Sequence, residues 1–223
     1  MLCLPPAAEM EFKKITPEEL LGPLNAVERK NAPRSLYVAG DIGLCRGRAR
    51  VSVIGTREVS PVGLKRTQDL VRMLVDRGAV IVSGLARGVD TGAHRAATLA
   101  GGRTIAVLGT PLGSFYPREN EELQRKIMAE HLVISQFPAG AAAERKNFAI
   151  RNRTMALVSH ATVIVEATDG SGTLHHGWEA LRLGRPLFLL ESLVKRADLK
   201  WPGEMIRYGA QVLTRGNIDV LAE

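Results

Sequence analysis

Short apolar runs, most of them rich in β-branched residues, alternate with helical patterns from Val51 to Glu191 of this 223-residue chain. In chain order the runs read VSVIG, AVIVSG, TIAVLG, LVISQF, ATVIVEA and PLFLLE. Strands that are apolar on both faces and separated by helices are typical of a parallel sheet covered by helices on both sides. The pattern therefore predicts an α/β fold: an extended Rossmann-like, doubly wound, mostly parallel sheet with helices on both faces.

The stretch between the first two runs carries the clearest helical pattern. A Ser-Pro pair, Ser60 and Pro61, marks the start of this helix, because proline is favoured in a first turn. In LKRTQDLVRMLVDRG the apolar residues share one helical face, namely Leu64, Leu70, Val71, Leu74 and Val75. Such a face is expected to pack against the sheet.

Residues 1–48 differ from the rest and form an N-terminal lead-in, and we assign residues 49–223 to the Rossmann-like domain. In the lead-in, ITPEELLGPLNAVERKN predicts a helix with Thr16 as its N-cap and Pro17 in its first turn. A short apolar strand, SLYVAG, and a basic connector, CRGRAR, follow. The lead-in holds too few apolar residues for a core of its own. The end of the chain adds one or two short helices and leaves room for an edge strand.

Composition excludes some functional classes and weakly favours one. The formal charge of +7 and the pI near 9.8 favour polyanionic partners, although basic enzymes are common. Cys3 and Cys45 lack the spacing of a zinc site or a disulfide framework, which predicts a reducing cytoplasm and no metal. No apolar run reaches the roughly 18 residues of a membrane helix, and the start lacks the basic segment of a signal peptide.

The first strand end predicts a phosphate site. In doubly wound sheets, ligands bind beyond the carboxyl ends of the strands, and here Gly55, Thr56 and Arg57 follow the first run. A glycine lets a ligand approach the backbone, the following helix N-terminus favours an anion, and arginine is a bidentate phosphate donor. The dinucleotide-binding pattern GxGxxG is missing. The alternative is a tight turn with a solvated arginine.

The second strand end reads SGLARGVD and contributes Ser83, Gly84, Arg87 and Gly88 to the predicted phosphate-binding surface. We expect Asp90 to cap the helix that carries His94. The two side chains lie one helical turn apart and could form an acid–base pair. Alternatively, Asp90 only ties the cap to its own helix.

The stretch after the fourth run combines basic side chains with an aromatic ring. Within nine positions it carries Arg145, Lys146, Asn147, Phe148, Arg151 and Arg153. Cations that hold phosphates beside a ring that stacks on a base suit single-stranded nucleic acid. The alternative is a solvated basic loop with Phe148 in the core.

The fifth strand end adds GSGT at a helix start, namely Gly170, Ser171, Gly172 and Thr173. Such a turn is an anion nest whose hydroxyls can hydrogen-bond a phosphate. His175 and His176 are adjacent, so they point to different sides of a helix. No strand end carries two close carboxylates, and the four ends together therefore indicate a surface that holds phosphate.

These residues resemble a known family. VIGTR with PVG, then VSGLARGVDTGAHRAATLAGGRTIAVLG, YPRENEEL, NFAIRNRTMALVS and VIVEA resemble, in order from about Leu36 to about Leu190, the DprA/Smf family (DNA-processing protein A). The resemblance implies a homodimer that binds single-stranded DNA and loads a RecA-type recombinase in DNA recombination, notably natural transformation. It implies no catalysis and no cofactor. It also implies that Arg57 and Lys146 contact phosphate, with Asn147, while Phe148 stacks on a base.

Three departures from the family pattern stand out. Many members carry a helical domain before the Rossmann-like domain and a winged-helix domain after it, and we expect only a remnant of the first here and none of the second. Thr56 replaces the usual serine and keeps the hydroxyl. After the fifth run, TDGSGTLHHGWEA replaces the usual ERSGALITA.

The last departure supplies the alternative function. GSGTL is similar to the PGGxGTLEE motif of LOG-type phosphoribohydrolases, which share the superfold and cleave the ribose–base bond of nucleotides. Their glutamates are replaced here by His175 and His176, and the nearest acid is Glu179. Without a carboxylate to stabilise the oxocarbenium charge, such hydrolysis is difficult. A nucleotide-binding module of the same superfold is the other alternative.

Overall fold

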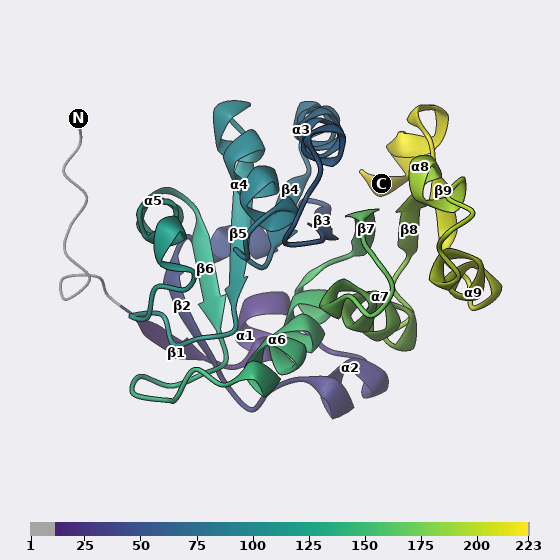
Figure 1. Ribbon diagram of the computed structural model, residues 1–223. Coiled ribbons are helices and arrows are strands. Elements are labelled where there is room, and N and C mark those ends of the chain that lie inside the picture. The colour runs from purple at the N-terminus through teal and green to yellow at the C-terminus, as the bar shows by residue number, and fades with distance from the viewer. Residues whose placement is uncertain (1–11, 223) are drawn as a thin grey trace.

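The computed structural model describes residues 12–222, so Cys3 and the expectations for the first eleven residues lie outside it. In this range the strands form one sheet in the order β1-β2-β6-β5-β4-β3-β7-β8-β9 (Figure 1). The strands are β1 (Lys13–Ile15), β2 (Leu36–Gly40), β3 (Arg50–Gly55), β4 (Val80–Ser83), β5 (Arg103–Leu108), β6 (Leu132–Ser135), β7 (Ala161–Glu166), β8 (Leu187–Leu190) and β9 (Gln211–Leu213).

The pairing confirms the predicted mostly parallel, doubly wound sheet. The six predicted apolar runs form β3 to β8, and all neighbouring pairs from β6 to β9 are parallel. The two strands of the lead-in, β1 and β2, are antiparallel and join the same sheet through β6. The strand order reverses at β3, which pairs with β4 on one side and β7 on the other. This switch point is where doubly wound sheets bind ligands.

Helices cover both faces of the sheet (Figure 1). They are α1 (Pro17–Leu21), α2 (Ala26–Asn31), α3 (Pro61–Asp76), α4 (Val89–Leu99), α5 (Glu121–Glu130), α6 (Arg145–Val158), α7 (Gly172–Arg182), α8 (Glu191–Val194) and α9 (Trp201–Arg207), with 3-10 turns η2 (Ile42–Cys45), η3 (Arg118–Asn120) and η4 (Arg215–Leu221). The helices α3 and α4 pack together, as do α6 and α7 on the other face.

The core consists of two layers separated by the sheet, because successive strand residues point to opposite faces. In β4, Val80 and Val82 pack in the layer with Met155 of α6, while Ile81 packs in the layer with Leu74 of α3. All of these side chains are buried. The helices therefore cover both faces of the sheet. Loops can form a site only at the ends of the strands, which the helices leave open.

Two of the predicted helix starts are confirmed. Thr16 caps α1 in a capping box with Glu19, and Ser60 caps α3 with Pro61 in the first turn. Across residues 12–222, no helix combines the length and apolar character that a membrane crossing requires.

Candidate nucleic-acid interface

The carboxyl ends of β3 and β7 meet at the switch point and hold the first glycine turn in place. The Thr56 N–H donates to the Glu166 carbonyl at 2.7 Å, and the Thr173 hydroxyl donates to the Gly55 carbonyl at 2.9 Å. A Cβ on Gly55 would lie 2.5 Å from Val89 Cγ2 and 2.7 Å from the Glu166 carbonyl oxygen. Only glycine at this position lets the β3 turn pack this closely against Val89 and Glu166. The Thr173 hydrogen bond joins this first predicted turn to the last one.

The second glycine turn packs directly on the first. Gly88 has φ +75°, and a Cβ there would lie 2.3 Å from the Thr56 carbonyl oxygen. The Val89 N–H donates to the same carbonyl at 3.2 Å. Asn120 anchors the other side of this loop by donating to the Leu85 carbonyl at 3.0 Å. Three predicted turns therefore form one continuous edge.

An arginine and two aromatic rings lie side by side at this edge. The guanidinium carbon of exposed Arg57 lies 5.6 Å from the centroid of the Phe148 ring. The Phe148 ring centroid lies 5.4 Å from that of Tyr116, with the planes tilted by 51°. Phe148 is half-buried, since one edge packs against Gly109, whereas Tyr116 is 52% exposed. The ring is thus neither fully exposed nor part of the core.

Tyr116 begins the YPRENEEL motif of the resemblance, but no role in binding is predicted for it from the sequence. It follows β5, one of the strands whose carboxyl end has no role in the sequence analysis, and the available signal is an aromatic residue in a glycine-rich loop, GTPLGSFYP. Tyr116 and Phe148 form a tilted pair of aromatic rings, and Arg57 lies beside the Phe148 ring. Aromatic rings next to cations are the features that bind single strands through stacking.

Further basic side chains at the start of α6 and in the second turn remain accessible. The Lys146 ammonium lies 2.7 Å from a Glu144 carboxylate oxygen, and both side chains are largely exposed. Arg87 pairs with exposed Glu119 in the same way. Exposed ion pairs contribute only about 0–1 kcal/mol, so a phosphate can displace either carboxylate at little cost.

The structure places Arg151 inside the protein, unlike the expected phosphate contact. The side chain is 5% exposed, and Nη1 donates to the carbonyls of Gly84 and Val107, the latter at 2.7 Å. A Cβ on Gly84 would lie 2.0 Å from Nη1. Burial lowers the pKa of Arg151, and buried Asp90 attracts it. Arg151 therefore ties the ends of β4 and β5 together beneath the surface.

Three other predicted residues also bond internally. The Ser83 hydroxyl donates to the Val53 carbonyl at 2.7 Å, and the Asn147 amide donates to the Ala142 carbonyl at 2.9 Å. Both side chains are buried. Arg153 pairs with Glu179 of α7 at 3.3 Å. The geometry gives these three a role in holding the turns and α6 in position.

The acid–base pair of Asp90 and His94 is not formed. The N-cap of α4 is Gly88, without a side-chain cap, so the expected cap at Asp90 is wrong. His94 is buried, with Nδ1 2.7 Å from the Thr104 hydroxyl, and burial lowers its pKa to about 3. Burial also raises the pKa of Asp90, against the attraction of Arg151. Both groups belong to the interior.

The N-terminus of α3, which was expected to favour a bound anion, is already occupied by a carboxylate of the protein itself, Glu166. The Glu166 carboxylate accepts from the Ser60 N–H at 3.0 Å and from the Ser60 hydroxyl at 2.7 Å. A Cβ on Gly63 would lie 1.9 Å from the same carboxylate. A phosphate at this edge therefore has to be met by Arg57 and the glycine turns, not by this helix end.

In the last turn Gly170 adopts a backbone conformation that favours glycine, and the helix that follows carries histidines where LOG-type enzymes carry glutamates. Gly170 has φ +74°, and Ser171 caps α7 by accepting from the Thr173 N–H at 3.3 Å. Buried His176 lies 3.0 Å from the Thr162 hydroxyl, whereas Glu179 is paired with Arg153 and Arg182. Within residues 12–222, no group of three or more possible metal ligands is found.

Comparison with known proteins identifies the family. The family described as DNA recombination-mediator protein A matches residues 13–222, nearly the whole chain. The chain belongs to this family, DprA/Smf. It is 36% identical over 216 residues to the DNA processing protein DprA of Streptococcus pneumoniae, covering 96% of this chain and 76% of that protein.

Solved DprA structures share the fold. The DprA structure from Streptococcus pneumoniae superposes with a TM-score of 0.81 at 31% identity, over 94% of this chain and 74% of that one. A DprA structure from Helicobacter pylori, described as showing a unique mode of single-stranded DNA binding, also gives 0.81, at 27% identity over 96% and 97% of the chains. This chain covers a smaller share of the length of some other family members, for example 52% of the Synechocystis protein Smf.

Proposed function

We propose that this DprA/Smf protein binds single-stranded DNA along the carboxyl edge of its sheet, as a DNA-processing recombination mediator. The observation that carries the proposal is the arrangement of Arg57, Phe148 and Tyr116 beside three interlocked glycine turns. The strand backbone follows the turns and cations, and bases stack on the rings. The relative from Helicobacter pylori, described by its single-stranded DNA binding, supports this interpretation.

The proposed contacts divide into direct and supporting residues. Direct contacts come from exposed or half-buried groups: Gly55, Thr56, Arg57, Arg87, Gly88, Tyr116, Lys146, Phe148, Gly170, Ser171, Gly172 and Thr173. Supporting residues fix these groups from within, namely Ser83, Gly84, Asn147, Arg151 and Arg153. Arg145, exposed at the start of α6, adds charge near Lys146.

We further propose that the protein acts without catalysis. LOG-type base release needs carboxylates at the start of α7, where this chain has exposed His175 and buried His176. The first acid within α7, Glu179, is held by two arginines. The nucleotide-hydrolysing alternative is therefore weaker. The dimeric state, the RecA-type partner and the cytoplasmic location belong to the same proposal, on the strength of family membership.

The test is fluorescence anisotropy with a labelled oligothymidine strand at two salt concentrations, with duplex DNA and AMP as competitors. With about four phosphates neutralised by Arg57, Arg87, Arg145 and Lys146, log K falls against log salt with a slope of about −3. Poor competition by duplex and AMP supports the proposal. A flat salt dependence or easy displacement by AMP contradicts it, and base release from AMP then becomes the next assay.

A further inference from the structure

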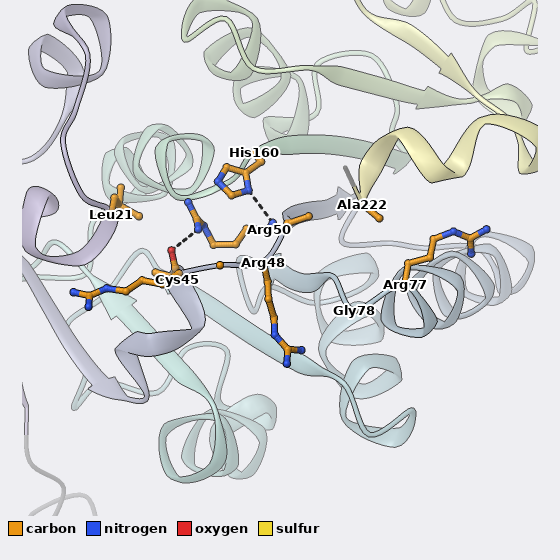
Figure 2. A pocket seen from close by; sticks show the side chains of 11 residues that line it. Leu21, Cys45, Arg48, Arg50, Arg77, Gly78, His160 and Ala222 are labelled. Carbon is orange, nitrogen blue, oxygen red and sulfur yellow. Dashed lines mark hydrogen bonds between the residues drawn. The ribbon is translucent and has the colours of Figure 1, made fainter.

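A second basic surface lies at the amino ends of the parallel strands, opposite the carboxyl ends that form the proposed DNA-binding edge. An open pocket of about 830 Å³ is lined by the connector before β3, by Gly78 before β4 and by His160 before β7, so it lies at the amino ends of parallel strands (Figure 2). Strand β3 runs from Arg50 to Gly55. Five residue steps of about 3.3 Å along a strand place its amino and carboxyl ends about 16 Å apart. The pocket is thus separate from the proposed DNA-binding edge.

Four arginines line this pocket, which we call the amino-edge pocket, and no carboxylate lines it in the part of the chain that the structure describes. The arginines are Arg46, Arg48, Arg50 and Arg77. Arg77 pairs with Asp219 on the 3-10 turn η4. Within residues 12–222, no ion pair neutralises the other three. Burial raises the pKa of the Cys45 thiol to about 11, so this lining residue supplies no negative charge either.

Arg50 is a buried cation that only neutral groups contact. It is 5% exposed, Nε donates to the Val158 carbonyl at 2.6 Å, and Nη1 donates to the Cys45 carbonyl (Figure 2). His160 beside it accepts from the Arg50 N–H at 3.2 Å. Burial, with Arg50 and Arg185 nearby, lowers the pKa of His160 to about 4. Buried charges are costly unless compensated, so an anion in the pocket would be stabilising.

We propose that the amino-edge pocket binds a small ligand that carries two or more phosphate groups, such as pyrophosphate or a nucleotide polyphosphate. Arginine forks bind phosphate oxygens in bidentate fashion. Figure 2 shows Arg48 and Arg77 on separate elements of the lining, which fits charge spread over several phosphates. The volume is that of a small-molecule site. The lining residues that the structure describes include no Phe, Tyr or Trp on which a DNA strand would stack.

The test is calorimetric titration of the full chain with pyrophosphate and with ATP, in parallel with oligothymidine anisotropy. Arg48 is exposed, so Arg48→Ala leaves the interior intact and is expected to weaken pyrophosphate binding about tenfold, the loss of one charge-assisted contact. Arg46→Ala with Arg48→Ala is expected to weaken it further. Arg95→Ala, at an exposed position on α4, is the matched control for net charge.

The outcomes separate this pocket from the DNA-binding edge. Pyrophosphate binding that falls in Arg48→Ala and holds in Arg95→Ala, with unchanged oligothymidine affinity, supports the pocket, even if Arg57→Ala fails to affect DNA. ATP binding with the same dependence identifies a nucleotide as a source of the phosphates. Absence of pyrophosphate binding, or equal affinity in all variants, overturns the proposal. Parallel loss of oligothymidine binding in Arg48→Ala also overturns it, because the pocket then belongs to the DNA path.

Discussion

Replacing Arg151 by methionine tests whether this buried cation stabilises the fold at the proposed DNA-binding edge. Methionine keeps much of the volume but removes the bonds from Nη1 to the carbonyls of Gly84 and Val107. Each bond from a charged donor contributes about 1.5–3 kcal/mol, and relief from burying the guanidinium offsets part of the loss. Asp90 also loses the cation that attracts it. We expect Arg151→Met to lower the free energy of unfolding by about 3 kcal/mol at pH 7.5, measured in urea.

The pH dependence of this destabilisation gives a sharper test. Burial raises the folded-state pKa of Asp90, so its contribution to stability is fully present at low pH and is lost as pH rises through that pKa. Without Arg151 the pKa rises further. The loss of unfolding free energy in Arg151→Met should therefore grow as pH rises above the ordinary Asp range, by at most about 1.4 kcal/mol per pH unit, and measurements at pH 5 and pH 8 test this.

Two variants control this experiment. Arg153→Met lies on the same helix but removes only a half-exposed ion pair with Glu179, so it should cost less than about 1 kcal/mol at either pH. Adding Asp90→Asn to Arg151→Met should remove the pH dependence. A destabilisation by Arg151→Met below about 1 kcal/mol, or one that does not change with pH, would refute the assigned role of the buried arginine.

Three further predictions concern the DNA-binding edge and are measured by oligothymidine anisotropy. Tyr116→Ala should weaken binding by about 1–3 kcal/mol through lost stacking, while Tyr208→Ala, an exposed tyrosine elsewhere, should leave it unchanged; equal effects would count against the ring pair. Phe148→Ala should cost a similar amount, and unchanged affinity would mean that its ring only packs against Gly109. Arg57→Ala should weaken all sequences alike and reduce the salt slope by about 0.7; a sequence-dependent loss would contradict a phosphate contact.

The parallel sheet could be predicted because its strands are apolar on both faces. Every residue from Val51 to Ile54 is buried, and such runs have few other interpretations. The edge strand β1 gave no such signal, since Lys13 and Lys14 are exposed and the strand has three residues. The lead-in strand β2 was recognised, but its antiparallel pairing with β6 joins segments far apart in the chain and has no local signature.

The candidate site was predictable in location but not in the roles of its charged groups. Glycine turns after buried strands indicated the edge, because the topology brings those ends together. That Glu166 occupies the N-terminus of α3 depends on a contact 106 positions away. Helix α6 has basic residues on several sides, so sequence could not tell that Arg151 points inward while Lys146 points to solvent.

Some charged groups at this edge bond within the protein and others face solvent, and this division decides which features of a nucleic acid the surface can recognise. Arg151 and Glu166 both bond within the protein: Arg151 joins two strand ends, and Glu166 holds Ser60, the N-cap residue of α3. Cations and rings remain among the groups that face outward, and they bind phosphates and base faces, which are common to every nucleotide sequence. A surface of this kind discriminates strandedness, because bases must be unpaired to stack, and it does not discriminate sequence. That selectivity is what a mediator acting on any single strand requires, and it follows from which side chains the fold leaves outside.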